Sequence, residues 1–169
     1  LHRIGNVHLK MEDPTRAMTY YEEAIGIWCK LCGFGPGGFS EYAQRDGIEV
    51  MIDSHRDLLR DMADTLHNMG GVYETNSDFG RALGCYNQAL ITKRSLLVEK
   101  EKSLARQTRL TPVDDYIVSS KTLSSAITLL RSGAIHVVLQ NHDVALSYYK
   151  SALRIQRQHL GRDHIAVAQ

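Results

Sequence analysis

An internal repeat is the feature that most constrains what this chain can fold into. Three segments of 25 residues align without gaps, and they begin at Leu1, Leu66 and Leu129. A unit this short cannot bury its own apolar surface, so the sequence predicts repeated units that stack on one another. Five aligned columns are identical in all three segments: Leu1/Leu66/Leu129, Gly5/Gly70/Gly133, Ala17/Ala82/Ala145, Tyr21/Tyr86/Tyr149 and Ala24/Ala89/Ala152.

Each segment has the pattern of two helices joined by a turn. In the first half, leucine, glycine and then tyrosine or histidine recur at i, i+4 and i+7, which is one face of a helix. Between the halves stands Asp13, Asp78 or Asn141, a residue type that caps helices by accepting hydrogen bonds from free N–H groups. Pro14 follows at a position that favours proline. We expect the small residues to let the helices approach closely and the tyrosines to fill the space between successive hairpins.

This order of leucine, glycine, alanine and tyrosine resembles the tetratricopeptide repeat. The resemblance implies an all-α fold, a right-handed superhelical solenoid whose first helices line a concave groove that binds peptides or protein segments. The chain departs from the family pattern at His8 and His136, which replace a packing tyrosine, and at Ser132, which replaces an apolar residue. We expect both histidines to be at least partly buried.

The last residues are similar to a linker found in the kinesin-light-chain type of this repeat. The run ALRIQRQHLGRDHIAVAQ, residues 152–169, leads in that type into the leucine of a new first helix, and the present chain begins at such a leucine. We therefore expect residues 1–169 to be a single array and a segment of a longer one. The repeat cores are expected at about 1–28, 64–94 and 127–157.

Two insertions separate the repeat cores, at about 33–60 and 95–125. In the first, a helix is expected to end near Cys32, a short strand is expected at 48–52, and a new helix resumes near Asp53. In the second, residues 79–109 read as one helix of about 46 Å at 1.5 Å per residue. Thr111 is expected to cap the next helix, with Pro112 first. The lengthened helices are expected to project as arms.

Residues 28–38, WCKLCGFGPGG, combine Cys-x-x-Cys with Gly-x-Gly-x-x-Gly. A redox cysteine pair sits at a helix N-terminus, where the helix dipole lowers the thiol pKa, but Cys29 and Cys32 fall at the end of a predicted helix. A dinucleotide-binding loop needs a strand before it and a helix after it. We therefore interpret both patterns as a helix ending, with Gly33 as its C-cap. A zinc half-site, completed by Cys85 or His55, is the alternative.

Composition narrows the remaining functions. Lys and Arg number 20 against 19 Asp and Glu, and the two signs are interleaved, so there is no field that would favour nucleic acid or an anionic membrane. Three cysteines favour a reducing compartment such as the cytoplasm. No apolar run is long enough for a membrane span. We find no catalytic constellation and expect no enzyme activity, cofactor or metal.

The resemblance implies that the partners are proteins, bound by groove-facing residues on the first helices. The candidate partner-binding residues are Arg3, Asn6, Lys10, His67, Asn68, Glu74, Arg131, Leu130 and Val138. His2, Asp64, Ile127 and Ala134 lie at neighbouring groove positions. Asparagine suits the backbone of an extended peptide because it donates and accepts at once.

Two details bear on the kind of partner. Asn6, Asn68 and Arg131 match places where chaperone-binding members of the family hold a terminal carboxylate, but His2 and Ile127 stand where lysines are needed. The apolar groove of the third copy predicts a partner or a packed inserted helix. We interpret the chain as a scaffold. The alternatives are a kinesin-light-chain-like cargo adaptor and a repeat domain appended to an enzyme outside this segment.

Overall fold

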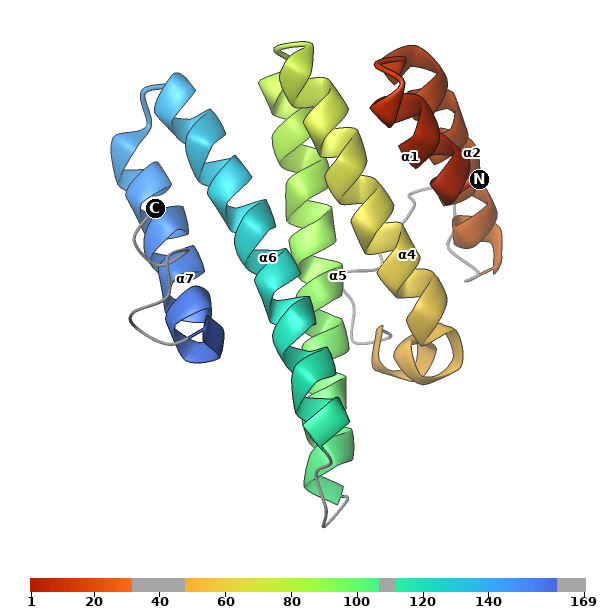
Figure 1. Ribbon diagram of the computed structural model, residues 1–169, viewed down its shortest axis with the longest axis vertical. Coiled ribbons are helices and arrows are strands. Elements are labelled where there is room, and N and C mark those ends of the chain that lie inside the picture. Colours follow the sequence, from red (N-terminus) through yellow and green to blue (C-terminus); the bar gives the residue numbers. More distant parts are fainter. Residues whose placement is uncertain (32–47, 107–111, 161–169) are drawn as a thin grey trace. The chain divides into compact units, whose positions relative to one another are not determined.

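The computed structural model describes residues 1–31, 48–106 and 112–160, and places side chains at 1–31, 55–96 and 123–160. In these ranges every regular element is a helix: α1 (His2–Lys10), α2 (Pro14–Leu31), α4 (Ile48–Thr75), α5 (Phe79–Arg106), α6 (Pro112–Val138) and α7 (His142–Leu160) (Figure 1). This confirms the predicted all-α fold, which is consistent with a helical-repeat solenoid; its handedness stays a prediction.

The chain divides into two compact units, Leu1–Leu96 and Leu97–Gln169. In the first unit, α1 and α2 form a hairpin, and α2 packs against α4. In the second unit, α6 and α7 form a hairpin. That residues 1–169 form a single array stays a prediction.

The three repeat turns share one backbone geometry. The residue two positions before each second helix has a positive φ, with values of 58° at Glu12, 58° at Ser77 and 61° at Gln140. The N–H of the following residue then donates to a carbonyl five residues back, over 2.8–3.0 Å: Asp13 to His8, Asp78 to Tyr73 and Asn141 to His136. This left-handed ending satisfies free carbonyls at the helix C-terminus and reverses the chain.

The predicted caps lie where the second helices begin. The Asp13 carboxylate accepts from the Arg16 N–H over 3.0 Å, and the Asp78 carboxylate accepts from the Arg81 N–H over 3.1 Å. Asn141 directly precedes α7, and its carbonyl accepts the first helical hydrogen bond, from Ala145. The capping predictions at both aspartates are therefore confirmed.

A contact between glycine and tyrosine closes each hairpin. A Cβ atom added to Gly5, Gly70 or Gly133 would lie 2.4, 2.5 or 2.6 Å from a ring carbon of the tyrosine in the same hairpin. The Tyr21 ring also packs against Met69 of the next hairpin. Each tyrosine therefore fills space inside its own hairpin, and Tyr21 also fills space between hairpins, as predicted.

The core of the first unit joins α2, α4 and α5. Leu59, Met62 and Leu66 of α4 cluster with Ala89 and Leu96 of α5. Ile25, Trp28 and Cys29 of α2 pack against this cluster. At its edge the buried Lys93 ammonium pairs with the Asp64 carboxylate over 3.2 Å.

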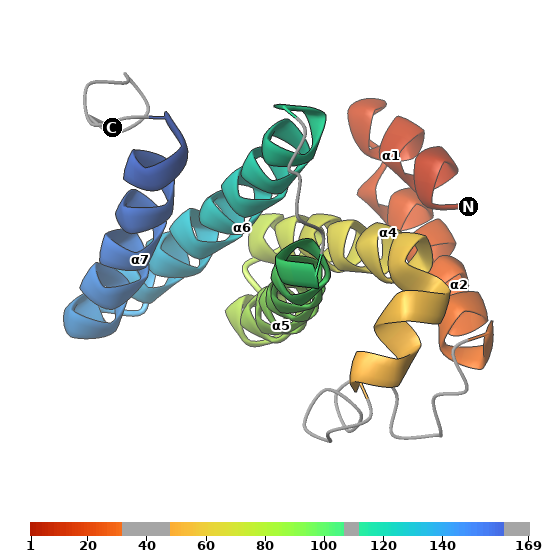
Figure 2. The ribbon, with the colours of Figure 1, turned by 90° about the horizontal axis from the view of Figure 1, so that it is seen from below.

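The structure of the first insertion differs from its prediction in one respect. The strand expected at 48–52 is wrong, because these residues begin α4, which bends at His55 (φ −133°, ψ 26°) (Figure 2). An isolated strand leaves its backbone groups without partners, whereas a helix satisfies them within the segment. A helix was expected to resume near Asp53, whereas α4 begins five residues earlier, at Ile48, and bends at His55.

The other insertion predictions are met in part. α2 ends at Leu31, close to the expected Cys32, and α6 begins at Pro112 as expected. α5 is continuous to Arg106, and residues 107–109 lie outside the described residues, as do Thr111, Cys32 and Gly33. Whether the lengthened helices project as arms stays a prediction.

Candidate functional site

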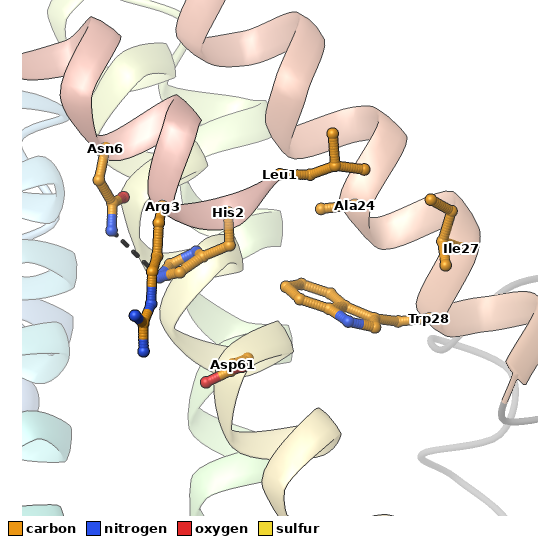
Figure 3. A pocket seen from close by; sticks show the side chains of 8 residues that line it. All are labelled: Leu1, His2, Arg3, Asn6, Ala24, Ile27, Trp28 and Asp61. Atoms are coloured by element: carbon orange, nitrogen blue, oxygen red, sulfur yellow. Dashed lines mark hydrogen bonds between the residues drawn. The ribbon is translucent and has the colours of Figure 1, made fainter.

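A pocket of about 520 Å³ lies where α1, α2 and α4 meet in the first unit. One wall is apolar and comes mainly from α2, with Ala24, Ile27 and Trp28 (Figure 3). The opposite wall is polar. It carries His2, Arg3 and Asn6 from α1 and Asp61 from α4, and Leu1 completes the lining (Figure 3). The volume falls in the range of small-molecule and peptide side-chain sites.

Hydrogen bonds hold two residues of the polar wall, His2 and Asn6, in place. The Asn6 side-chain oxygen accepts from the Tyr21 hydroxyl over 2.7 Å and from the Asn68 amide over 2.8 Å. The Asn6 amide nitrogen must then face His2, and it lies 3.1 Å from His2 Nε2. His2 Nδ1 lies 2.5 Å from the Thr65 hydroxyl. The network thus links residues of α1, α2 and α4.

The same network sets the protonation of His2. The Thr65 hydroxyl donates to the Asp61 carbonyl over 2.8 Å, so it accepts from His2 Nδ1–H. His2 Nε2 must then accept from the Asn6 amide, which requires a neutral imidazole. Burial lowers the pKa of His2 and outweighs the carboxylates of Asp61 and Asp64, which raise it. We therefore assign His2 as neutral, with its proton on Nδ1.

The predicted groove residues of the first unit have different surroundings. Arg3 and Asn6 line the pocket, and Asn68 donates to Asn6. His67 and Glu74 instead contact the buried Tyr86: the rings of His67 and Tyr86 lie 5.4 Å apart, and the Tyr86 hydroxyl donates to Glu74 over 2.6 Å.

The remaining predicted groove residues are exposed. Lys10 lies in the last turn of α1. In the second unit, Leu130, Arg131 and Val138 are exposed on α6, together with Ile127. Within the first unit, the structure brings Arg3, Asn6 and Asn68 together at or beside the pocket, and His67 and Glu74 together at Tyr86.

The histidines that replace the usual tyrosine stack on a tyrosine of the partner helix. His8 stacks on Tyr20 with ring centroids 5.2 Å apart, and His136 stacks on Tyr148 at 5.4 Å. Both histidines are partly buried, as predicted.

Sequence reasoning missed Asp61, Ile27 and Trp28 as pocket residues. Their spacing along the helices could have identified two of these residues. Asp61 lies seven residues before Asn68 on α4, and Trp28 lies seven residues after Tyr21 on α2, so each shares a face with a residue of the network. The bend of α4 at His55 was not predicted either, so the sequence did not show that α4 begins at Ile48.

The structure describes two of the three cysteines, Cys29 and Cys85. Cys29 lies in the last turn of α2, as predicted, and Cys32 lies outside the described residues. Burial raises the pKa of the Cys85 thiol to about 11. Among residues with described side chains, no three His, Cys, Asp or Glu residues are grouped as metal ligands would be.

No helix of the described ranges is long and apolar enough to cross a membrane.

Comparison with known proteins gives one finding. The family model described as tetratricopeptide repeat matches residues 1–37 and 128–166, somewhat less than half of the chain. The matched segments contain the α1–α2 hairpin and most of the α6–α7 hairpin. Neither the curated proteins nor the solved structures gave a match. The family match supports a tetratricopeptide repeat protein.

Proposed function

We propose that this chain is a non-catalytic scaffold that binds an extended segment of a partner protein at the pocket between α1, α2 and α4. The observation that carries the proposal is the pairing of an apolar wall with a polar wall in which hydrogen bonds hold His2 and Asn6 in place. The family match supports a protein-interaction role, because repeats of this family are typically non-catalytic interaction modules.

The two walls suit the two parts of an extended peptide. An apolar side chain of the partner would bury surface against Ile27 and Trp28. The Arg3 guanidinium can donate to a main-chain carbonyl, and the Asp61 carboxylate can accept from a main-chain N–H. The network already orders the side chains of His2 and Asn6, so binding would cost little further side-chain entropy at these two residues.

We assign Asn6 a positioning role within this site. Its side-chain oxygen accepts two hydrogen bonds and its amide nitrogen contacts His2, so most of its polar capacity is used inside the protein. The ligand contacts are then expected at Arg3, Asp61 and Trp28.

The test is a peptide-display selection on the whole chain, followed by titration of the selected peptides. Trp28 is the only tryptophan of the chain, so its fluorescence reports occupation of the pocket directly. We expect selected peptides to share an apolar residue and to shift the Trp28 emission. Ile27→Asp should abolish the shift.

Ile91→Asp is the matched control. Ile27 and Ile91 are 43% and 40% exposed, but Ile91 is not among the residues that line the pocket. If both variants weakened binding equally, or if the selection returned no peptide that perturbs Trp28, the pocket would not be the binding site.

The narrower assignment to a kinesin-light-chain-like cargo adaptor remains a proposal based on residues 152–169. α7 accounts for the helical start of that segment, through Leu160. A heptad-rich coiled coil in the same polypeptide would support the adaptor. A catalytic domain in the same polypeptide would instead support an interaction domain appended to an enzyme.

A further inference from the structure

The outer face of α7 carries a group of basic side chains. Lys150, Arg154 and Arg157 are spaced i, i+4 and i+7, so they lie on one side of the helix. All three are exposed. None of them forms an ion pair with another residue whose side chain the structure describes. We call these three residues the α7 basic patch.

The packing of α7 leaves this patch uncovered within its own hairpin. The buried residues of α7, Ala145 and Ala152, lie on the opposite side of the helix. The side chains beside the patch are small and turned onto the backbone. The Ser147 hydroxyl donates to the Val144 carbonyl over 2.7 Å, and the Ser151 hydroxyl donates to the Ser147 carbonyl over 2.9 Å. The cations are therefore accessible to a partner.

The other repeats show that this face is an outer face whether or not another hairpin follows. The positions of Lys150 and Arg154 are exposed in both other repeats, where they are occupied by Glu22 and Gly26 in α2 and by Asn87 and Ile91 in α5. Arg157 corresponds to the half-buried Cys29 and to the exposed Arg94. Since α2 has α4 packed against it, exposure of this face does not depend on the absence of a neighbouring helix.

The electrostatics of the helix itself account for one of the three charges. A cation in the last turn of a helix interacts favourably with the helix dipole, and Arg157 lies in the last turn of α7. Lys150 and Arg154 lie further back, where this effect is lost. The acid of α7, Asp143, is in its first turn, two turns before Lys150, and residues 123–138 of α6 contain no acid. Nothing on these segments neutralises the patch.

We propose that the α7 basic patch binds an acidic helix of a partner protein. Carboxylates spaced i, i+4 and i+7 on that helix cover about 10.5 Å along its axis, which matches the same spacing in the patch. The two guanidinium groups can each bind a carboxylate through two hydrogen bonds. Three cations on two helical turns suit a short acidic run, and a net charge of +1 offers no wider field to hold a polyanion.

The patch acts chiefly on partner choice and on the rate of association. Exposed ion pairs are individually weak, whereas complementary charge selects partners and speeds their encounter. None of the three residues lines the pocket between α1, α2 and α4, so the patch is a second site that does not depend on the first.

The experiment uses the whole chain and two labelled, alanine-rich helical peptides at low salt, followed by fluorescence anisotropy. Both peptides contain three glutamates. In the first peptide the glutamates are spaced i, i+4 and i+7, and in the second they are spread around the helix. We expect the first peptide to bind, the second to bind roughly threefold or more weakly, and the difference to shrink at high salt.

Matched variants of the protein locate the contact. Lys150→Gln with Arg154→Gln should weaken binding of the first peptide roughly fivefold to tenfold, because two of the three ion pairs are lost. Lys10→Gln with Lys30→Gln makes the same change in net charge at exposed lysines in the last turns of α1 and α2. This control should leave binding unchanged.

Four outcomes would overturn the proposal. The first is equal binding of the two peptides, and the second is equal weakening by the two pairs of substitutions. The third is tighter binding of duplex DNA or phosphatidylserine vesicles than of the peptide, lost in the Lys150 and Arg154 variant, since the ligand would then be a polyanion. The fourth is self-association that the same variant abolishes, since a second copy would then occupy the patch.

Discussion

Replacing Gly70 by alanine tests whether the contact between glycine and tyrosine holds each hairpin closed. The new Cβ would lie 2.5, 2.7 and 3.0 Å from three ring carbons of Tyr86. Carbon atoms pack at about 3.5–4.0 Å, so the ring must move by roughly 1 Å. It has little room to do so, because Tyr86 is 0% exposed and its hydroxyl donates to Glu74 over 2.6 Å.

The expected loss follows from three terms. Overpacking costs about 1–3 kcal/mol, and weakening a hydrogen bond to a carboxylate adds about 1.5 kcal/mol. The higher helix propensity of alanine offsets about 1 kcal/mol of this loss in stability. We therefore expect Gly70→Ala to lower the free energy of unfolding by about 1.5–3.5 kcal/mol.

Gly84→Ala in α5 is the matched control. A Cβ there meets nothing within 4 Å, so only the helix propensity changes and stability should rise by about 1 kcal/mol. Urea unfolding followed by Trp28 fluorescence measures both variants, because all three residues belong to the unit Leu1–Leu96. In a Tyr86→Leu background the cost of Gly70→Ala should shrink by more than half. A Gly70→Ala protein as stable as Gly84→Ala would refute the reasoning.

Three further predictions concern protonation and backbone strain. The lowered pKa of His2 means that the unfolded chain binds a proton more readily, so stability should fall as pH drops below about 6.5. Urea midpoints at several pH values measure this, and a His2→Gln protein with the same pH slope would contradict it. Cys85, with its pKa raised to about 11, should react with iodoacetamide far more slowly in the folded than in the unfolded protein; equal rates by mass spectrometry would count against its burial. Gln140→Gly should stabilise the chain by about 0.5–1 kcal/mol, because φ is 61° there, whereas Gln158→Gly within α7 should cost about 1 kcal/mol. Circular dichroism during thermal unfolding compares the two, and a loss of stability in Gln140→Gly would disprove the strain.

Much of the local structure could be predicted from the sequence alone. The repeat columns located the hairpins, and Asp13 and Asp78 cap their second helices as expected. These features depend on residues three or four apart, so a single segment contains all the information they need. The left-handed residues at Glu12, Ser77 and Gln140 escaped prediction because none is a glycine.

The candidate site depended on contacts that sequence spacing does not specify. Arg3, Asn6 and Asn68 were predicted as groove residues, but only the packing of three helices shows that Asn6 is held by Tyr21 and Asn68. Residues 48–52 show the same limit, since a short apolar run suits a strand or a helix until its hydrogen-bond partners are known.

The repeat, its hairpins and the all-α class follow from the sequence alone, because periodic apolar positions, caps and glycines act within one short segment. Which polar residues form a site, and whether an apolar face is covered, depends on packing between segments. Ile4 and Met69 occupy the same repeat position, yet one is exposed and the other is buried under α2. Burial depends on what lies beside a helix, and that neighbour is set by packing between segments rather than by the pattern within one.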